Sequence, residues 1–163
     1  MSPLNCPISN NTNEIMTTLD MTDLKTRVAK WTQTYTNAIT QNYKEYHLNM
    51  LTRDSHPCPD YAREQLDAIE NGTAKLMYFK VNTGKKYYKI VQMEYDTFYK
   101  TKNGYREGSV HAFVDKETGQ VYKPASWRAP AKHVRYDMRI IREREFLFNY
   151  NNTDWAGGYL YLR

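Results

Sequence analysis

The stretch Lys75–Tyr95, KLMYFKVNTGKKYYKIVQMEY, decides the fold because its apolar and aromatic residues alternate with polar ones. A period of two is typical of β-strands, and the NTG triplet between two such runs indicates a tight turn. The pattern continues downstream, where KNG and KETG separate further alternating runs up to Pro124. We therefore expect an antiparallel meander of four or five strands over residues 76–124.

The residues before this stretch follow a helical period instead. From Leu24 to Met50 the apolar residues recur at steps of three and four, which predicts one long amphipathic helix over about 20–51. The apolar stripe is expected to pack on the sheet. A stripe of this length is also typical of helices that pair with a second copy, so a homodimer through the long helix is the alternative.

The ends of the helical part, residues 17–72, carry recognisable signals. TTLD at Thr17 has the form of a capping box, and residues 1–16 are expected to form a flexible tail because they show no period. Pro59 suits the first turn of a second helix, and Gly72 suits its end. The sequence therefore predicts two helices before the sheet.

The residues after Pro124 are less regular. ASWRAPAKH, residues 125–133, is expected to be a loop. For residues 134–150 the alternation of charges and then of aromatic residues favours a strand over a helix, and residues 151–163 end in a short strand pattern. We predict a single α+β domain spanning 1–163, with two N-terminal helices packed on an antiparallel sheet of about five strands.

The net charge of +5 is unevenly distributed. Residues 1–74 carry six Lys and Arg against nine Asp and Glu, whereas residues 75–163 carry seventeen against nine. Eleven of the fifteen tyrosines also lie in this second, basic part. Such a composition is typical of surfaces that contact phosphates and stack on bases. It also fits a sheet that simply carries lysines on its edge strands.

Two segments hold the residues that we predict to bind nucleic acid. One is the turn region of the first hairpin, and the other is KPASWRAPAKHVRY, residues 123–136, where cations alternate with aromatic residues. The predicted residues are Lys85, Lys86, Lys89, Lys123, Trp127, Arg128, Lys132 and Arg135. Their cations would contact phosphates and the indole would stack on a base. Alternatively, Trp127 closes one end of the sheet's core and the cations are only solvated.

The sequence gives little support for a catalytic site or a metal-binding site. The best catalytic constellation is His111, Asp115, His133 and Asp137, which gives an enzyme with a His111/His133 site as a third hypothesis. His47, His56 and Cys58 lack the spacing of a zinc site. Phosphate-binding glycine motifs do not occur. We therefore expect no metal, no cofactor and, on balance, no enzymatic activity.

The segment SVHAFVDKETGQVYKPASWRAPAKHVRYDM, residues 109–138, resembles a family of small, uncharacterised tailed-bacteriophage proteins. The shared features are His111 to Asp115, Thr118-Gly119, Val121 to Lys123, Ala125-Ser126-Trp127, Ala129 to Lys132 and Val134-Arg135-Tyr136. The resemblance implies an accessory protein of a phage, acting in the host bacterial cytoplasm or in the virion. It implies no activity or catalytic residue.

Two partner classes follow from these observations. The first is nucleic acid. The second is a protein, which would make the chain a binding module: an inhibitor of a host factor or defence system, or a minor virion component. A membrane partner is not expected, because no stretch approaches 18 apolar residues and no signal peptide is recognisable.

Overall fold

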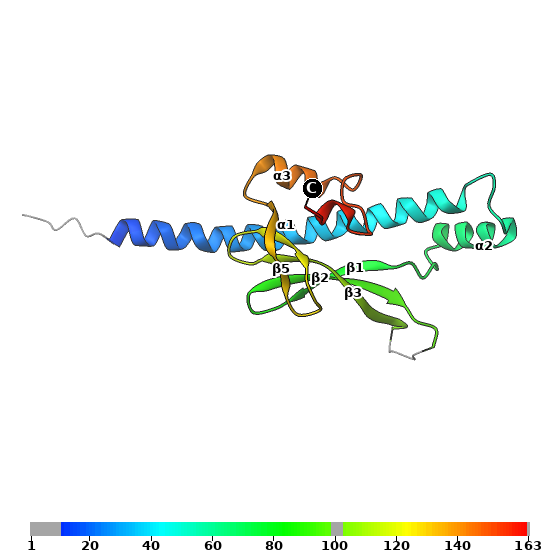
Figure 1. Ribbon diagram of the computed structural model, residues 1–163, viewed down its shortest axis with the longest axis horizontal. Helices are drawn as coiled ribbons and strands as arrows, with labels where there is room; N and C mark the ends of the chain where they lie inside the picture. The colour runs from blue at the N-terminus through cyan, green and yellow to red at the C-terminus, as the bar shows by residue number, and fades with distance from the viewer. Residues whose placement is uncertain (1–10, 99–102, 163) are drawn as a thin grey trace, which may run out of the picture.

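The computed structural model describes residues 11–98 and 103–162. Two helices are followed by a five-stranded antiparallel sheet and a short helical C-terminal region (Figure 1). The elements are α1 (Asn11–Leu51), α2 (Pro59–Glu70), β1 (Tyr78–Thr83), β2 (Tyr87–Tyr95), β3 (Tyr105–Asp115), β4 (Gln120–Pro124), β5 (Pro130–Asp137), α3 (Ile141–Phe148) and the 3₁₀ helix η1 (Gly158–Leu160). The prediction of an α+β fold is confirmed.

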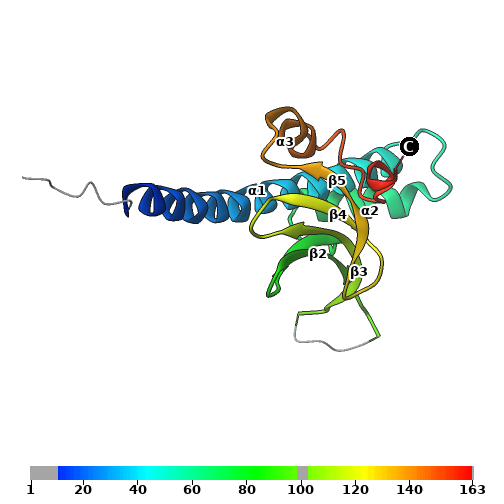
Figure 2. The same ribbon diagram turned by 60° about the vertical axis from the view of Figure 1, so that its left-hand side comes forward.

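The sheet is a meander in which each strand pairs with the next one along the chain. Its strands curl strongly below α1 (Figure 2). Four strands lie where the alternation predicts them. The fifth, β5, begins at Pro130, so the loop expected over 125–133 is shorter than predicted. Lys132 and His133 therefore lie in an exposed strand rather than in a loop.

The core lies between α1 and the sheet. Val28, Tyr35 and Ile39 of α1 are fully buried against Ile90 and Val114 of the sheet. The prediction that the helical stripe packs on the sheet is confirmed. Burying such side chains stabilises the fold by about 1.5–3 kcal/mol each, and this burial fixes which face of the sheet stays outside.

The first helix is longer than predicted. It begins at Asn11 rather than near residue 20, and its N-terminal part extends beyond the sheet (Figure 1). The capping sequence at Thr17 therefore lies inside the helix, where Thr and Asp cost less than about 0.7 kcal/mol each relative to Ala. Of the expected tail, residues 11–16 are helical, and residues 1–10 lie outside the described part of the chain.

The second helix begins at Pro59, as predicted, and packs against α1. Its end is followed by Gly72 with a φ of 72°, in the left-handed region that glycine adopts without strain. Ala62 is the buried residue of this helix. No helix in the described ranges is long and apolar enough to cross a membrane.

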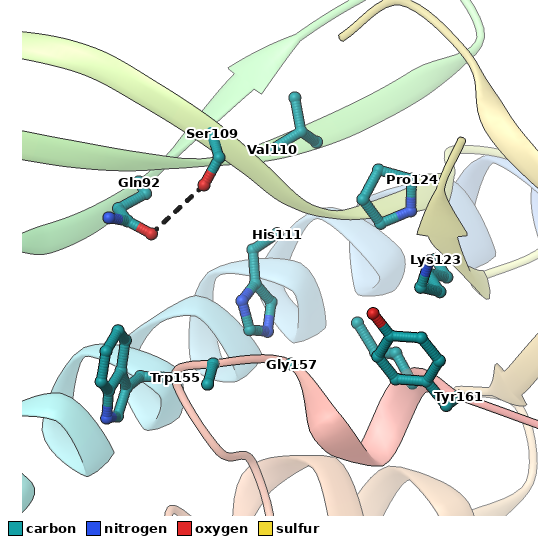
Figure 3. Close-up of a pocket in the computed structure, with 11 residues that line it drawn as sticks. Gln92, Ser109, Val110, His111, Lys123, Pro124, Trp155, Gly157 and Tyr161 are labelled. Atoms are coloured by element: carbon teal, nitrogen blue, oxygen red, sulfur yellow. Dashed lines mark hydrogen bonds between the residues drawn. The ribbon is translucent and has the colours of Figure 1, made fainter. Parts of the chain in front are cut away.

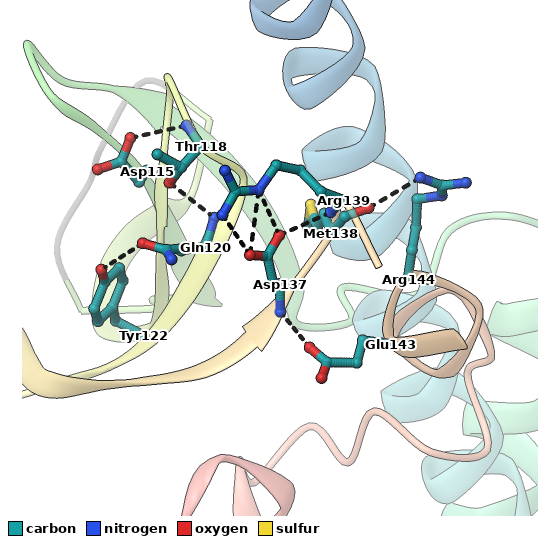
Figure 4. Close-up of polar contacts among 9 residues, drawn as sticks. All are labelled: Asp115, Thr118, Gln120, Tyr122, Asp137, Met138, Arg139, Glu143 and Arg144. Carbon is teal, nitrogen blue, oxygen red and sulfur yellow. Dashed lines mark hydrogen bonds and ion pairs between the residues drawn. The ribbon is translucent and has the colours of Figure 1, made fainter. Parts of the chain in front are cut away.

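The segment after β5 is helical, so the strand predicted through residue 150 is wrong beyond Asp137. The chain reverses at Asp137, whose carboxylate pairs with Arg139 and whose backbone N–H donates to the Glu143 carboxylate (Figure 4). Arg144 donates to the carbonyl of Met138, 3.0 Å away. These contacts start α3 and turn Leu147 into the core, where it is fully buried. The alternating charges of this segment fit a helix as well as a strand.

The C-terminal segment is also not a strand, because it folds into η1 and lies across α1 and β3. The Tyr159 hydroxyl lies 2.5 Å from the Tyr35 hydroxyl and 2.7 Å from Nε2 of His111. Trp155 packs edge-on against Tyr43, with 5.4 Å between the ring centres. Tertiary contacts rather than a strand ladder hold this segment.

Candidate functional site

The outer face of the sheet, opposite α1, carries a concave site beside the β1–β2 turn. The site has a volume of about 330 Å³. It is lined by Asn82, Thr83, Gly84, Lys85, Lys86, Tyr87, Lys89, Phe113 and Arg128, and we call it the cationic pocket. Four of these side chains are cations, and none of the described lining residues is a carboxylate. The site therefore suits an anionic ligand.

The tight β1–β2 turn places two of the cations at its tip. The backbone N–H of Gly84 donates to the carbonyl of Tyr87 at 2.9 Å, and a Cβ at Gly84 would lie only 2.8 Å from that carbonyl oxygen. Glycine is therefore needed for this close approach. Lys85 and Lys86 follow directly, so the turn projects them beside the pocket.

The strand register brings Lys89 and the aromatic wall to the same face. Lys89 pairs with Phe113 on β3, and Phe113 pairs with Tyr122 on β4. Tyr87 contacts both aromatic rings edge-on, with ring centres 5.9 Å and 6.0 Å away. Edge-to-face contacts of this kind are favourable, so they stabilise the aromatic wall of the pocket.

The β4–β5 loop folds toward this face and supplies the remaining residues. The Ser126 hydroxyl accepts hydrogen bonds from the backbone N–H groups of Arg128 and Ala129, which closes the loop. Trp127 lies at its tip with 40% of its surface exposed, and its ring centre is 4.6 Å from Nζ of Lys89. The indole therefore does not close the core; it covers Lys89 at the surface.

The electrostatics keep Lys86 charged. Its hydrogen bond with Tyr87 raises the pKa of Lys86, and the nearby Asp115 carboxylate adds to this rise. Asp115 itself accepts hydrogen bonds from the backbone N–H groups of Glu117 and Thr118 in the β3–β4 turn. Its carboxylate therefore has a structural role in that turn.

Four of the eight predicted binding residues line the pocket, namely Lys85, Lys86, Lys89 and Arg128, and Trp127 lies beside it against Lys89. The other three do not line the pocket. Nζ of Lys123 lies 4.5 Å from the ring centre of Tyr161, and Arg135 donates to the carbonyl of Leu160 at 2.6 Å. Lys132 is exposed on β5. Lys123 and Arg135 thus hold the C-terminal segment instead of joining the cationic pocket.

The two histidines of the catalytic hypothesis do not share a pocket. His111 lines a cavity of about 360 Å³ between the sheet and the C-terminal segment, together with Gln92, Ser109 and Lys123 (Figure 3). His133 is exposed on β5 and is not among the described residues that line this cavity.

His111 is held as a neutral ring. A bulge leaves it without a register partner on β2, and both His111 and its neighbour Ala112 are buried. Burial lowers the pKa of His111 to about 4, although Asp154 and a hydrogen bond with the Trp155 backbone partly oppose this. His111 therefore contributes to packing through its contact with Tyr159.

The histidines considered as zinc ligands contact residues that are close to them in the chain. Nδ1 of His56 lies 2.9 Å from the carbonyl oxygen of Cys58, and the Cys58 side chain is exposed. His47 stacks on Tyr43 with 5.9 Å between ring centres. Within the described ranges, no three His, Cys, Asp or Glu side chains lie close enough together to hold a metal ion.

Some contacts between distant residues could not have been predicted from the sequence. Tyr159 and Tyr35 contact each other across 124 positions, and His111 reaches Tyr159 across 48. Lys116 is also not among the predicted binding residues, although its ammonium donates to the carbonyl of Gly84 at 3.2 Å and so contacts the β1–β2 turn. No local pattern signals contacts of such separation.

The chain is a small α+β protein in which a helix covers one face of an antiparallel meander and a cationic pocket lies on the other face. The chain belongs to a family of unknown function (DUF7717), whose model matches residues 13–162. No curated protein and no solved structure matches the chain. Family membership therefore carries over no activity, and the phage origin stays a prediction.

Proposed function

We propose that this protein binds nucleic acid through the basic surface formed by Lys85, Lys86, Lys89, Trp127 and Arg128. The observation that carries the proposal is the convergence of four cations on one pocket whose described lining contains no carboxylate. These residues come from two hairpins that are separate in the sequence. A patch of solvated lysines would not require such convergence.

Each part of the surface has a chemical role in this proposal. The ammonium and guanidinium groups contact phosphates and release counterions, which makes binding dependent on salt. Lys89 covers part of the Trp127 ring, and the exposed part of the indole is open to a base. The aromatic wall keeps the cations on one side of the ligand.

The proposed role is that of a non-enzymatic accessory protein, and the setting that goes with it is a phage in its bacterial host. The aromatic and cationic chemistry of the site supports binding rather than reaction. His111, the most buried titratable histidine near a cavity, is occupied by its hydrogen bond to Tyr159.

The test is equilibrium binding of a fluorescently labelled oligonucleotide at 50 mM salt. The variant Lys85→Gln/Lys89→Gln/Arg128→Gln removes three charges from the pocket, and we expect binding to weaken about 100-fold or more. The control Lys44→Gln/Arg53→Gln/Arg63→Gln removes three exposed charges from the helical part. It should bind within about threefold of the wild type. No binding by the wild type, or an equal loss in the control, would contradict the proposal.

A further inference from the structure

A second cationic concavity lies on the other side of the β1–β2 turn. It has a volume of about 390 Å³ and is lined by Lys25, Lys85, Lys86, Tyr88, Lys116 and Glu117. Lys85 and Lys86 line both this site and the cationic pocket. The two concavities therefore meet at the tip of one turn.

The additional cations come from elements outside the proposed binding surface. Lys25 lies on α1, whose N-terminal part extends past the sheet (Figure 1), and its ammonium pairs with Glu117 after β3. Lys116 lies in the β3–β4 turn, where its backbone N–H donates to the carbonyl of Lys86 at 3.1 Å. Its ammonium lies 5.4 Å from the ring centre of Tyr88. Turn-to-turn contacts thus hold Lys116 beside the two shared lysines.

The single carboxylate of this second site is weakly held. Glu117 lies 3.5 Å from the Lys25 ammonium, and both side chains are more than half exposed. An exposed ion pair of this kind contributes about 0–1 kcal/mol. A phosphate can therefore replace Glu117 as the partner of Lys25 at little cost.

We infer that the ligand is a single strand of nucleic acid that crosses the β1–β2 turn, running from Trp127 and the cationic pocket to Lys116 and Lys25. This inference rests on the proposed function and extends it to a path and a ligand class. Lys85 and Lys86 lie in the middle of the path. The cationic pocket holds the part of the strand on one side of these lysines, and the second concavity holds the part on the other side.

The shape of the surface favours a single strand over a duplex. Stacking on Trp127 needs a base that is free of its pairing partner. The path also turns over the tip of a hairpin, which a flexible single strand can follow. A duplex is stiff over this distance, with a persistence length of about 150 base pairs, so it would contact one concavity at a time.

The test compares oligonucleotides of two lengths. The probes are labelled oligothymidylates of four and twelve nucleotides. Binding of a twelve-nucleotide oligouridylate and of a twelve-base-pair duplex is measured in the same way. For Lys25→Gln/Lys116→Gln we expect binding of both twelve-nucleotide strands to weaken about 10- to 100-fold at 50 mM salt, with a salt slope that is less steep by about 1.4. Binding of the four-nucleotide strand should change less than about twofold, because that strand is held at the cationic pocket.

Two further variants keep the test decisive. Because Lys116 also contacts the turn, Lys25→Gln alone separates charge from turn geometry, and we expect about half of the double variant's effect on the logarithmic scale. Glu117→Gln removes the carboxylate and should tighten binding of the twelve-nucleotide strands. The control Lys44→Gln/Arg53→Gln should leave binding unchanged.

The outcomes separate the two claims. A wild-type protein that binds none of the probes overturns the proposed function. A wild-type protein that binds the long strand equally well without Lys25 and Lys116 overturns only the path. Tighter binding of the duplex than of either single strand overturns the ligand class, whereas a difference between the thymidylate and uridylate arms tells which single strand is preferred.

Discussion

The ammonium of Lys89 lies 4.6 Å from the centre of the Trp127 ring. This contact joins β2 to the β4–β5 loop and brings the two segments singled out in the sequence onto one surface. Cation–π contacts at exposed sites contribute about 0.5–1 kcal/mol, which is enough to bias the loop toward the sheet. Under the proposed function, a base stacks on the side of the indole away from Lys89.

Replacing Trp127 should weaken nucleic-acid binding without unfolding the protein. For Trp127→Ala we expect single-strand binding to fall about 5- to 150-fold, because stacking of a base on an aromatic ring contributes about 1–3 kcal/mol. Trp127→Phe should retain most of the affinity. Fluorescence anisotropy measures both variants, and thermal denaturation should show little change for either. Equal binding by Trp127→Ala and the wild type would remove the indole from the binding surface.

The stability of the fold should depend on pH through His111. The pKa of His111 is lowered to about 4 in the folded chain, against about 6.5 when unfolded. As the pH falls from 6.5 to 4, the unfolded chain takes up a proton that the folded chain does not. The free energy of unfolding should therefore decrease as the pH decreases, by up to about 3 kcal/mol from this group.

The matched variant for this prediction is His111→Gln, which cannot titrate. Urea denaturation at several pH values gives the difference in stability between the wild type and the variant. This difference should be largest near pH 7 and should shrink by about 3 kcal/mol toward pH 4. A difference that stays constant across this range would show that His111 titrates normally.

The Tyr159 hydroxyl should contribute more to the stability of the fold than the Tyr35 hydroxyl does. Tyr159→Phe leaves both the His111 ring nitrogen and the Tyr35 hydroxyl without their shared partner, at an expected cost of about 1–3 kcal/mol. Tyr35→Phe removes one bond and its own polar group together, at an expected cost of about 0.5–1.5 kcal/mol. Denaturant midpoints measure both variants, and a larger effect for Tyr35→Phe would contradict this order.

Two glycines with the same backbone conformation should differ in their tolerance of alanine. Gly119 has a φ of 73°, and a Cβ there would lie 3.2 Å from a methyl group of Val28 and 3.3 Å from Cβ of Met138. Gly72 has a φ of 72°, and a Cβ there would meet no atom within 4 Å. Gly72→Ala should cost only the left-handed strain, about 1–2 kcal/mol.

Gly119→Ala should cost about 1–3 kcal/mol more, because it adds overpacking against the core. Thermal or urea denaturation of the two variants gives the comparison. Equal losses of stability would mean that α1 and the β3–β4 turn have room to separate, contrary to the tight packing in the structure.

Local patterns in the sequence predict the parts of the fold that local interactions determine. The period of two around Gly84 locates β1 and β2, and the stripe containing Tyr35 and Ile39 locates the buried face of α1. Pro59 correctly marks the start of α2. These features depend on neighbours in the chain, so a single sequence contains them.

Long-range contacts decide the remainder. α3 follows from the Asp137–Glu143 and Met138–Arg144 contacts, which no alternation of charges reveals. Lys123 and Arg135 look equivalent to Arg128 in the sequence, yet only Arg128 reaches the cationic pocket. Lys123 and Arg135 contact the C-terminal segment instead. The conformation of that segment depends on Tyr35, which lies far away in the chain.

The salt dependence of single-strand binding tests the central claim most directly. For the wild type, we expect the logarithm of the binding constant to fall linearly with the logarithm of the salt concentration, with a slope of about −3 to −4 for four to six phosphate contacts. The variant Lys85→Gln/Lys89→Gln/Arg128→Gln should reduce the steepness by about 2, whereas Lys44→Gln/Arg53→Gln/Arg63→Gln should leave the slope unchanged. A slope near zero for the wild type, or the same slope in the wild type and the pocket variant, would contradict the claim that this pocket binds nucleic-acid phosphates.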